Sequence, residues 1–370
     1  MSGPEDYKQC RENNDPSPSI VDGRPYLPHL KVDEARSPKS IAQIAATILN
    51  QELSPDQLNV KKVTGGITNA LFRVSGFANE SFDSVLVRIF GAEGMIDRDL
   101  ETCTYAALCD AKIAPGYLGR FGNGRVETWL DDYVPLDFDE LSDPDTSCKI
   151  ASNMAEVHTF VVKGDLCDYY TEPGMWDQLF SWMKQAKGSK FQSPDDEARV
   201  KDLNLKDIEH QLHYLKNDVV PSEARAAFSH NDLLAGNIMK QTVEPFAIQL
   251  IDFEYGGWNY VGFDIANHFN EWAGGTDDGK PDYSKFPTKD QQRRFVEAYV
   301  RASSSNSADV ADHIVQNLLN EVHAFVLANH LYWGLWAVNQ ASAEGCEDFD
   351  YLLYAANRFQ QYRTECGKEM

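Results

Sequence analysis

The amino-acid sequence predicts an α+β fold with two lobes, a small lobe built on an antiparallel sheet and a larger, mostly helical lobe. The chain has 370 residues, more than one average domain. Short runs of β-branched and aromatic residues occur up to about residue 130, and apolar stripes with a helical period dominate afterwards. We therefore expect a disordered tail over residues 1–28, a first lobe over residues 29–130 and a helical lobe over residues 131–370.

Composition and processing signals narrow the class of protein. The first 28 residues are polar and proline-rich without a periodic pattern, which indicates disorder and not a signal or transit peptide. No apolar run reaches the roughly 18 residues of a membrane span. The 7 cysteines are scattered without a CxxC pair, so neither a disulfide framework nor a zinc site is expected. We infer a reducing, cytoplasmic setting.

The net charge of -23 argues against a nucleic-acid partner, because a phosphate backbone requires a basic surface. Strong acidity suits cationic ligands and metal ions, although solubility explains it equally well.

The first lobe is expected to begin with a helix and to continue as strands. Apolar residues recur at helical spacing from Ile41 to Leu49, with Ser40 placed as the N-cap. Three strand-like runs follow, LNVKKVT, ALFRVS and SVLVRIF, and then a helical face from Leu100 to Ala111. YLGRF and RVETWL flank Gly122–Gly124, a hairpin signal. This order predicts a compact antiparallel lobe.

The second lobe shows apolar stripes with a period near 3.6 residues, typical of amphipathic helices. The expected helices cover Ile150–Val161, Ala198–Leu215, Lys289–Ala302 and Ala311–Ala341. A strand-and-loop portion between the second and third of these contains most of the polar motifs.

The stretch FSHNDLLAGNIM places Asp232 five residues before Asn237, and Asp252 follows the apolar run Ile248–Ile251. Phosphoryl transfer needs a proton acceptor for the attacking hydroxyl and hard oxygen ligands for Mg2+. Protein kinases supply these groups as His-Arg-Asp, an Asn five residues after that Asp, and then Asp-Phe-Gly. A surface turn followed by a core strand is the alternative interpretation. The order and spacing of the three residues favour a phosphoryl-transfer site.

The first lobe is then expected to bind a nucleotide. A glycine-rich turn between two strands allows backbone N–H groups to approach phosphate oxygens, although the same pattern also fits an ordinary hairpin turn. Its residues are Gly65, Gly66, Ile67, Thr68 and Asn69. Arg88 stands where the third strand of a kinase lobe presents its phosphate-binding cation, and Glu101 is expected to pair with it. An exposed surface pair is the alternative.

Two further patterns indicate a site for the acceptor substrate. Asp264, Asn267, His268 and Glu271 share one helix face, and the absence of lysine argues against a merely solvated face. Trp333 and Trp336 lie one helical turn apart. They fit an aromatic wall for an ammonium group as well as they fit core packing.

These motifs closely resemble the choline/ethanolamine kinase family over roughly Tyr26 to the end of the chain. The resemblance is strongest in HNDLLAGNIM, LIDFEYGGWNYVGFDIANHFNEWAG and WGLWAVNQ. Within the family, VTGGITN, VRIFGAEGMIDRD and NHFNEWAG are similar to the ethanolamine kinase branch, whereas choline kinases typically carry Cys in place of Asn270. The chain departs from the family pattern in the spacer Gly275–Tyr283 and at Ala266, where Gly is common.

The resemblance implies a protein-kinase-like fold and an activity that uses ATP and Mg2+. It makes Asp232 the catalytic base, Asn237 and Asp252 the magnesium ligands, and Arg88 with the turn Gly65–Asn69 the contacts to the ATP phosphates. The other residues that it assigns belong to the adenine-binding hinge (Thr128, Trp129, Leu130), the amine pocket (Tyr255, Glu271, Trp333, Trp336, Tyr351) and a supporting group (Glu101, Asp264, His268).

The implied reaction is the ATP-dependent phosphorylation of ethanolamine to phosphoethanolamine, the first step of the CDP-ethanolamine route to phosphatidylethanolamine. A choline kinase or a dual choline/ethanolamine kinase is the nearest alternative. A protein kinase fits less well, because Glu254 replaces the Gly of Asp-Phe-Gly and no Ala-Pro-Glu element follows. A catalytically inactive nucleotide-binding scaffold would not need Asp232, Asn237 and Asp252 together. The expected partner is a small amino alcohol, and the resemblance allows a homodimer.

Overall fold

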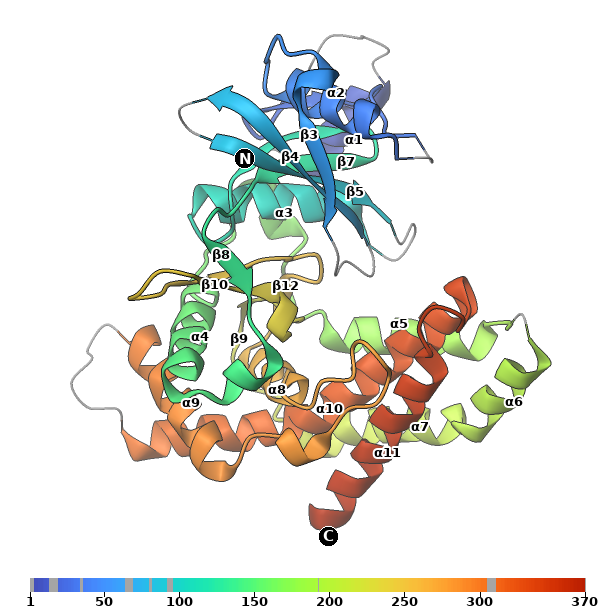
Figure 1. The fold of residues 1–370 in the computed structure, drawn as a ribbon. Helices are drawn as coiled ribbons and strands as arrows, with labels where there is room; N and C mark the ends of the chain where they lie inside the picture. The colour runs from blue at the N-terminus through green and yellow to red at the C-terminus, as the bar shows by residue number, and fades with distance from the viewer. Residues whose placement is uncertain are drawn as a thin grey trace. The chain divides into compact units, whose positions relative to one another are not determined.

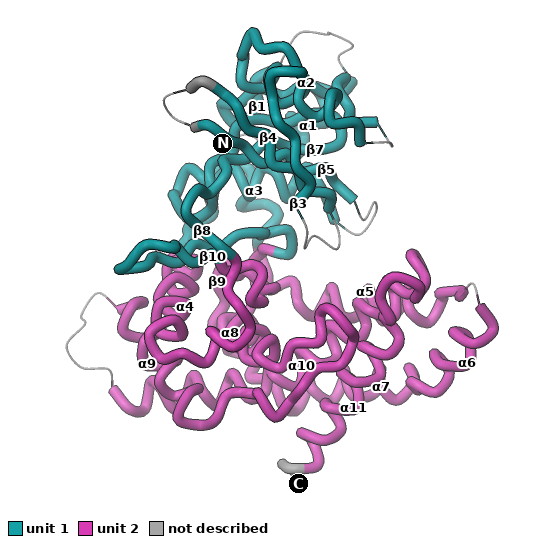
Figure 2. Tube along the Cα trace, viewed as in Figure 1, with its two compact units in different colours: residues 1–134, 160–170, 239–255 teal, residues 135–159, 171–238, 256–370 magenta. Residues whose placement is uncertain are grey.

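The computed structural model describes residues 3–12, 19–33, 36–63, 69–79, 82–91, 96–191, 193–304 and 311–369 (Figure 1). The chain divides into two compact units, coloured separately in Figure 2. Unit 1 comprises residues 1–134, 160–170 and 239–255, and unit 2 comprises residues 135–159, 171–238 and 256–370. The expected α+β class is confirmed, since unit 1 contains a large sheet and unit 2 is mostly helical.

The boundaries differ from those expected from the sequence. Residues 160–170 and 239–255 lie beyond residue 130 but belong to unit 1. Tyr170 Oη lies 2.7 Å from Thr104 Oγ1, and Gln249 Nε2 donates to the carbonyl oxygen of Ile113 at 2.7 Å. Composition did not show that these two segments belong to unit 1, because their placement depends on long-range contacts.

Unit 1 is built on a sheet whose described strands follow the order β1-β2-β6-β7-β5-β4-β3. Their bounds are β1 Ser19–Val21, β2 Arg24–Leu27, β3 Asn59–Val63, β4 Asn69–Asn79, β5 Phe82–Phe90, β6 Tyr117–Phe121 and β7 Gly124–Thr128. The five strands expected from the sequence, β3 to β7, pair antiparallel. The sheet is not antiparallel throughout, because β2 runs parallel to β6.

The first 28 residues are not a disordered tail where the structure describes them. They form helix α1 (Pro4–Glu12) and strands β1 and β2. The rings of Tyr7 and Tyr26 are buried edge to face with centroids 5.1 Å apart, and Arg11 forms two hydrogen bonds with Asp99. The prediction was wrong because a few long-range aromatic and ionic contacts hold this segment, and a polar composition does not display them.

Two helices flank the sheet of unit 1. Helix α2 (Pro38–Ile48) buries Ile41, Ile44 and Ile48 in a core shared with the inner residues of the strands. Its N-cap is Ser37, so Ser40 lies inside the first turn and the predicted cap was wrong. Helix α3 (Arg98–Asp110) starts at Asp97, whose side chain accepts hydrogen bonds from two backbone N–H groups of the first turn.

Unit 2 has helices around the long α10. The helices are α4 Pro144–Val157, α5 Met175–Gly188, α6 Pro194–Asp202, α7 Leu205–Tyr214, α8 Val261–Glu271, α9 Lys289–Ser303, α10 Asp312–Glu344 and α11 Tyr351–Glu369. The helix expected over Ala198–Leu215 is two helices, because Asn204 adopts a left-handed backbone conformation with φ 56°. The sequence reading did not identify α5 and α11.

Short elements carry the polar motifs. Strand β9 (Ala226–Ser229) pairs antiparallel with β12 (Gly257–Tyr260). A second sheet has the order β11-β10-β8, formed by β8 Tyr133–Pro135, β10 Ile238–Gln241 and β11 Ile248–Leu250. Single helical turns lie at Pro55–Gln57, Phe138–Ser142, Gly164–Asp168, Leu215–Val219, Ala235–Asn237 and Tyr283–Lys285.

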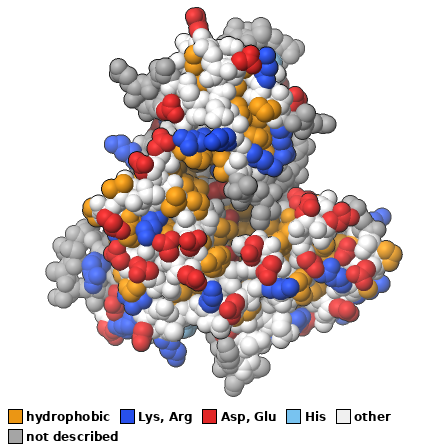
Figure 3. All heavy atoms as spheres, in the orientation of Figure 1, with side chains coloured by type: hydrophobic (Ala, Val, Ile, Leu, Met, Phe, Trp, Pro, Cys, Tyr) orange, Lys and Arg blue, Asp and Glu red, His pale blue; other side chains and the backbone are white. Residues whose placement is uncertain are grey.

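Figure 3 shows acidic side chains spread over the displayed face and interspersed with basic ones, in line with the net charge of -23. Within the described ranges, no helix is both long enough and apolar enough to cross a membrane.

The contact between α10 and α11 gives a test of the packing in unit 2. A Cβ atom added at Gly334 would lie 2.3 Å from Cε1 of the buried Phe359, whereas one added at Gly188 would meet nothing within 4 Å. We expect Gly334→Ala to lower the free energy of unfolding by about 1–3 kcal/mol through overpacking. Gly188→Ala, the control, should cause no loss. Urea denaturation followed by circular dichroism measures both, and equal midpoints for the two variants would contradict this packing.

Candidate active site

The loop that carries Asp232 begins where β9 ends in unit 2. Asn231 has a φ of 66°, a left-handed conformation that Asn tolerates better than most residues. Its side-chain oxygen accepts a hydrogen bond from Asn259 Nδ2 at 2.7 Å, so a residue of the neighbouring strand β12 supports the turn. The strand pair therefore fixes the start of the loop.

Asp264, on helix α8, holds the backbone of the same loop. Its two carboxylate oxygens accept hydrogen bonds from the backbone N–H groups of His230 at 3.0 Å and Asn231 at 2.6 Å. His158 Nε2 lies 2.9 Å from the carboxylate, and the Asp264 side chain is fully buried. Burial would raise the pKa of Asp264, but the hydrogen bonds and charge of the two histidines outweigh burial and lower this pKa. We had expected Asp264 to line the acceptor site, and the structure instead places it under the loop.

His268 supports the next residue of the loop. Trp272 Nε1 donates to His268 Nε2 at 3.3 Å, so the imidazole proton is on Nδ1 and donates to the carbonyl oxygen of Leu233 at 3.0 Å. Burial lowers the pKa of His268 to about 4, which keeps the ring neutral at physiological pH. His268 therefore acts here as a structural support.

Asp232 and Asn237 come together, as their spacing predicts. Asn237 Nδ2 donates to the carbonyl oxygen of Asp232 at 2.8 Å and approaches its carboxylate at 3.3 Å. Because the amide nitrogen faces Asp232, the amide oxygen of Asn237 is the atom suited to a cation.

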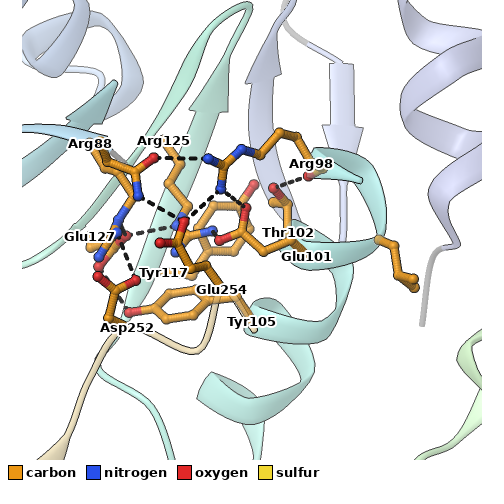
Figure 4. Close-up of polar contacts among 12 residues, drawn as sticks. Arg88, Arg98, Glu101, Thr102, Tyr105, Tyr117, Arg125, Glu127, Asp252 and Glu254 are labelled. Atoms are coloured by element: carbon orange, nitrogen blue, oxygen red, sulfur yellow. Dashed lines mark hydrogen bonds and ion pairs between the residues drawn. The ribbon is translucent and has the colours of Figure 1, made fainter. Parts of the chain in front are cut away.

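Asp252 and Arg88 meet in unit 1. Asp252 follows β11, has a φ of 63°, and accepts a hydrogen bond from Arg88 Nη1 at 2.9 Å. Arg88 lies on β5 and donates from Nε to Glu127 Oε1 at 2.9 Å (Figure 4). Burial would lower the pKa of Arg88, but the carboxylates of Asp252 and Glu127 outweigh burial and raise this pKa. The phosphate-binding cation expected from the sequence is thus a buried, permanently charged group.

The predicted pairing of Arg88 with Glu101 was wrong. Glu101 instead accepts a hydrogen bond from Arg125 Nη1 at 2.6 Å and from Arg98 at 3.1 Å. The carboxylate that reaches Arg88 comes from strand β7 as Glu127. Arg125 and Glu127 were not identified from the sequence, although two opposite charges at alternate positions of the strand-like run RVETWL mark one polar face.

The glycine-rich turn can be followed only at its end. Gly65, Gly66, Ile67 and Thr68 lie outside the described residues. Asn69 begins β4, donates from Nδ2 to Glu254 Oε2 at 2.9 Å and accepts from Arg98 Nη2 at 3.1 Å.

The residues expected at the adenine hinge lie at the end of β7. Thr128 is the last residue of this strand, and its backbone N–H donates to the carbonyl oxygen of Gly116 at 2.8 Å. The Trp129 ring packs under the guanidinium of Arg73 at 4.8 Å, and Leu130 is half-buried. An adenine contact of these residues stays a prediction.

Glu271 is the acidic residue among those expected to contact the amine. It ends α8 with an exposed fraction of 3%, and its Oε1 lies 3.5 Å from Arg358 Nη1. Its Oε2 has no hydrogen-bond partner among the described residues. Burial raises the pKa of Glu271. A buried carboxylate oxygen without a donor is a strong acceptor for an incoming N–H group.

Three aromatic side chains from α10 and the start of α11 pack against one another. Trp333 and Trp336 pack edge to face with centroids 5.5 Å apart, and Trp336 packs on Tyr351 at 5.7 Å. All three residues are buried, and the Tyr351 hydroxyl donates to Glu344 at 3.0 Å. Tyr255, the fifth residue assigned to the amine pocket, belongs to unit 1 and is half-buried.

Tyr354 contacts the arginine that pairs with Glu271, and the sequence did not identify it. Its hydroxyl accepts a hydrogen bond from Arg358 Nη1 at 3.2 Å. Burial raises the pKa of Tyr354, Arg358 opposes the shift, and the charges of Glu271 and Asp232 add to it. Arg358 therefore links Tyr354 to Glu271, and the position of Tyr354 four residues before Arg358 on one helix was the available signal.

The side chains available to bind a metal ion offer oxygen ligands. No group of three or more His, Cys, Asp or Glu side chains suited to a metal occurs within the described ranges. Mg2+ does not need one, because it typically takes one or two carboxylates together with water and substrate phosphates. The amide oxygen of Asn237, in unit 2, and the carboxylate of Asp252, in unit 1, are each a hard ligand of the kind that Mg2+ takes.

The family model described as choline/ethanolamine kinase matches residues 60–363. A probable ethanolamine kinase of Arabidopsis thaliana is 33% identical over 317 residues, covering 85% of this chain and 81% of the relative. Probable choline kinase 2 of the same plant is 34% identical over 334 residues, covering 88% of this chain and 91% of the relative. An ethanolamine kinase structure from Plasmodium vivax has a TM-score of 0.77 and 23% identity, covering 99% of this chain and 96% of that chain. This likeness confirms the expected two-lobed, protein-kinase-like fold.

Asp264 gives a test of how the loop is held. Replacing a charged, buried acceptor by an amide breaks its pairing with His158, so Asp264→Asn should lose roughly 3–5 kcal/mol of unfolding free energy at pH 7. Asp218→Asn, which changes an exposed residue of the same unit, serves as the control and should lose little.

The dependence of stability on pH should also differ between the unmodified chain and Asp264→Asn. Because the pKa of Asp264 is lowered in the folded protein, its contribution is present above about pH 4 and is lost as the pH falls through the folded-state pKa. The unmodified chain should therefore lose stability more steeply in acid than Asp264→Asn does. Parallel curves of stability against pH would contradict this role of Asp264.

Proposed function

Because the chain belongs to the choline/ethanolamine kinase family, we propose that it transfers the γ-phosphoryl group of ATP to the hydroxyl of ethanolamine. The products are phosphoethanolamine and ADP. The observation that carries the proposal is the loop of Asp232 and Asn237, two residues that follow each other in the order and spacing of the kinase template. A buried hydrogen bond from the backbone N–H of Asn231 to Asp264 holds the start of this loop.

In this proposal Asp232 is the base. Its carboxylate accepts the proton of the ethanolamine hydroxyl as the oxygen attacks the γ-phosphorus and the bond to the β-phosphate oxygen breaks. The supports from Asp264 and His268 keep the loop backbone in place, which reduces the entropic cost of aligning the hydroxyl.

ATP is proposed to bind through Arg88, the turn Gly65–Asn69 and the hinge Thr128–Leu130. Asn237 and Asp252 would hold Mg2+, which when bound neutralises negative charge on the β- and γ-phosphates. Arg88 adds a buried positive charge beside Asp252.

Ethanolamine is favoured over choline by the acceptors around Glu271. A primary ammonium has three N–H donors and needs acceptors, whereas a trimethylammonium has none and depends on aromatic faces. Glu271 Oε2 offers a buried acceptor without a partner among the described residues. Asn270, the residue before Glu271, donates to Asn329 Oδ1 at 2.8 Å. Choline kinases typically carry Cys at the position of Asn270.

A choline kinase or a dual kinase is the second candidate. The supporting observations are the aromatic rings of Trp333, Trp336 and Tyr351 and the 34% identity to a probable choline kinase. We place the proposed reaction at the start of a CDP-ethanolamine route to phosphatidylethanolamine. We also propose a cytoplasmic setting, which the scattered cysteines of the sequence, without a CxxC pair, support.

The direct test compares acceptors. ADP release should be followed with ethanolamine, its mono- and dimethylated derivatives and choline as separate acceptors at saturating ATP and Mg2+. We expect kcat/KM to be highest for ethanolamine and to fall with methylation. Equal kcat/KM for ethanolamine and choline would overturn the preference and leave a dual kinase, whereas no ADP release with any amino alcohol would overturn the reaction itself.

Asp232→Asn tests the proposed base. The amide cannot accept the proton but keeps the shape of the side chain, so kcat should fall about 10²–10⁴-fold while ATP affinity and the melting temperature stay close to those of the unmodified chain. Steady-state kinetics and calorimetry with a nonhydrolysable ATP analogue measure the two effects. A kcat near that of the unmodified chain would exclude Asp232 as the base.

Glu271→Gln and Trp333→Ala test how the amine is recognised. Glu271→Gln removes the negative charge and should weaken ethanolamine use more than choline use. Trp333→Ala removes an aromatic face worth about 0.5–2 kcal/mol to a trimethylammonium, so choline use should suffer more. Trp182→Ala, which changes another buried tryptophan of unit 2, controls for general destabilisation. Identical losses for both amines in every variant would contradict these roles.

A further inference from the structure

Unit 1 contains a closed chain of alternating charges that is almost entirely buried (Figure 4). The chain starts and ends on the same short segment, at residues two positions apart. Its members in order are Asp252, Arg88, Glu127, Arg125, Glu101, Arg98 and Glu254, each within 3.1 Å of the next. The segment proposed to bind the metal ion is therefore tied at both ends to one ion-pair network.

Glu127 is the member of this network that sets the direction of Arg88. Its Oε1 accepts hydrogen bonds from Arg88 Nε at 2.9 Å and Arg125 Nε at 2.7 Å, and its Oε2 accepts from the Tyr105 hydroxyl at 3.0 Å. The donors come from β5, β7 and α3. Burial would raise the pKa of Glu127, but the two arginines outweigh burial and lower it to about 2, so the carboxylate stays charged.

The occupancy of both Glu127 oxygens limits how Arg88 can bind it. An arginine next to a carboxylate usually forms two parallel hydrogen bonds, one to each oxygen. Here Arg88 gives Glu127 only Nε, while Arg125 shares the first oxygen and Tyr105 competes for the second. The Nη1 group of Arg88 is thereby kept for the side of Asp252.

Arg125 is the residue best placed to maintain this arrangement. It lies directly opposite Arg88 in the β5–β7 register, and two facing positive charges require a shared carboxylate between them. Its Nη1 binds Glu101 while its Nε binds Glu127, so one rigid guanidinium joins α3 to β7. A lysine, with a single compact ammonium, cannot reproduce two such directed bonds.

We propose that Arg125 is a positioning residue for nucleotide binding, which keeps Arg88 singly bonded to Glu127 so that its Nη groups face the phosphates. Arg125 acts through Glu127, and Tyr105 assists from the other oxygen. The proposal rests on the proposed function, in which Arg88 and Asp252 meet the phosphates and the metal ion. Without Arg125 or the Tyr105 hydroxyl, Arg88 forms the paired bonds with Glu127 and withdraws from Asp252.

A purely structural role for Arg125 has a matched control in the same unit. Arg120, on the adjacent strand β6, is also buried, is ion-paired to Asp99 at 2.9 Å and lies 4.6 Å from the Tyr7 ring. It lies opposite Arg125 in the β6–β7 register, but among the described residues its ion pair is with Asp99 and not with a member of the alternating chain. Loss of buried charge pairing should destabilise Arg120→Lys and Arg125→Lys alike, whereas Arg125→Lys changes the phosphate contact as well.

The experiment measures KM for ATP, KM for ethanolamine, kcat and the melting temperature for the full chain and its variants. Because a hydrogen bond to a charged group corresponds to a factor of about ten in an equilibrium constant, Arg125→Lys should raise KM for ATP about tenfold. KM for ethanolamine should stay unchanged, and Arg120→Lys should leave both KM values unchanged. Tyr105→Phe, which keeps the ring and should fold even where Arg125→Lys does not, should raise KM for ATP about fivefold.

Two results would overturn the proposal. One is an unchanged KM for ATP in Arg125→Lys, or in Tyr105→Phe where the lysine variant does not fold. The other is an equal rise in KM for ATP in Arg120→Lys. Arg88→Lys and Asp252→Ala separate this failure from failure of the proposed function, because both should weaken magnesium-dependent binding of an ATP analogue in calorimetry. If neither does, the assignment of the phosphate and metal groups fails first.

Discussion

A carboxylate buried away from water must be paired, and this constraint holds one group of site residues in place within each unit. An ionised group loses its hydration on burial, and only hydrogen-bond donors or positive charges at short range compensate for that loss. Asp264 meets the requirement with two backbone N–H groups and a histidine, and thereby fixes the loop of Asp232. Glu127 meets it with two arginines and a tyrosine, and thereby directs Arg88. Pairing and positioning are the same interaction in each case.

Glu271 is the informative exception to full pairing. It is as buried as the others, but its contact with Arg358 is long and its second oxygen has no hydrogen-bond partner among the described residues. The pKa of Glu271 is raised accordingly, whereas those of Asp264 and Glu127 are lowered. A folded protein keeps such an incompletely satisfied group at a cost of about 1–3 kcal/mol. A cationic ligand that supplies the missing donors would offset this cost, and the proposed amine provides them.

Local chemistry was readable from the sequence, and long-range pairing was not. The spacing of Asp232 and Asn237 predicted their contact because five residues of one loop bring both side chains together. Strands β3 to β7 were identified because alternation within a strand is a local signal. The partner of Arg88 was missed, because Glu127 follows it by 39 residues and several carboxylates fit the same role. The order in residues 3–12 and 19–28 was missed for the same reason, since it depends on contacts such as Arg11 with Asp99.

The central claim, transfer of a phosphoryl group from ATP to ethanolamine, is tested most directly by one competition experiment. The full chain is incubated with ATP, Mg2+ and equal concentrations of ethanolamine and choline, and the products are followed by phosphorus-31 NMR. We expect the phosphoethanolamine resonance to grow first, in step with ADP, and the phosphocholine resonance to lag behind it. Inorganic phosphate as the only new product, or phosphocholine forming first, would contradict the account.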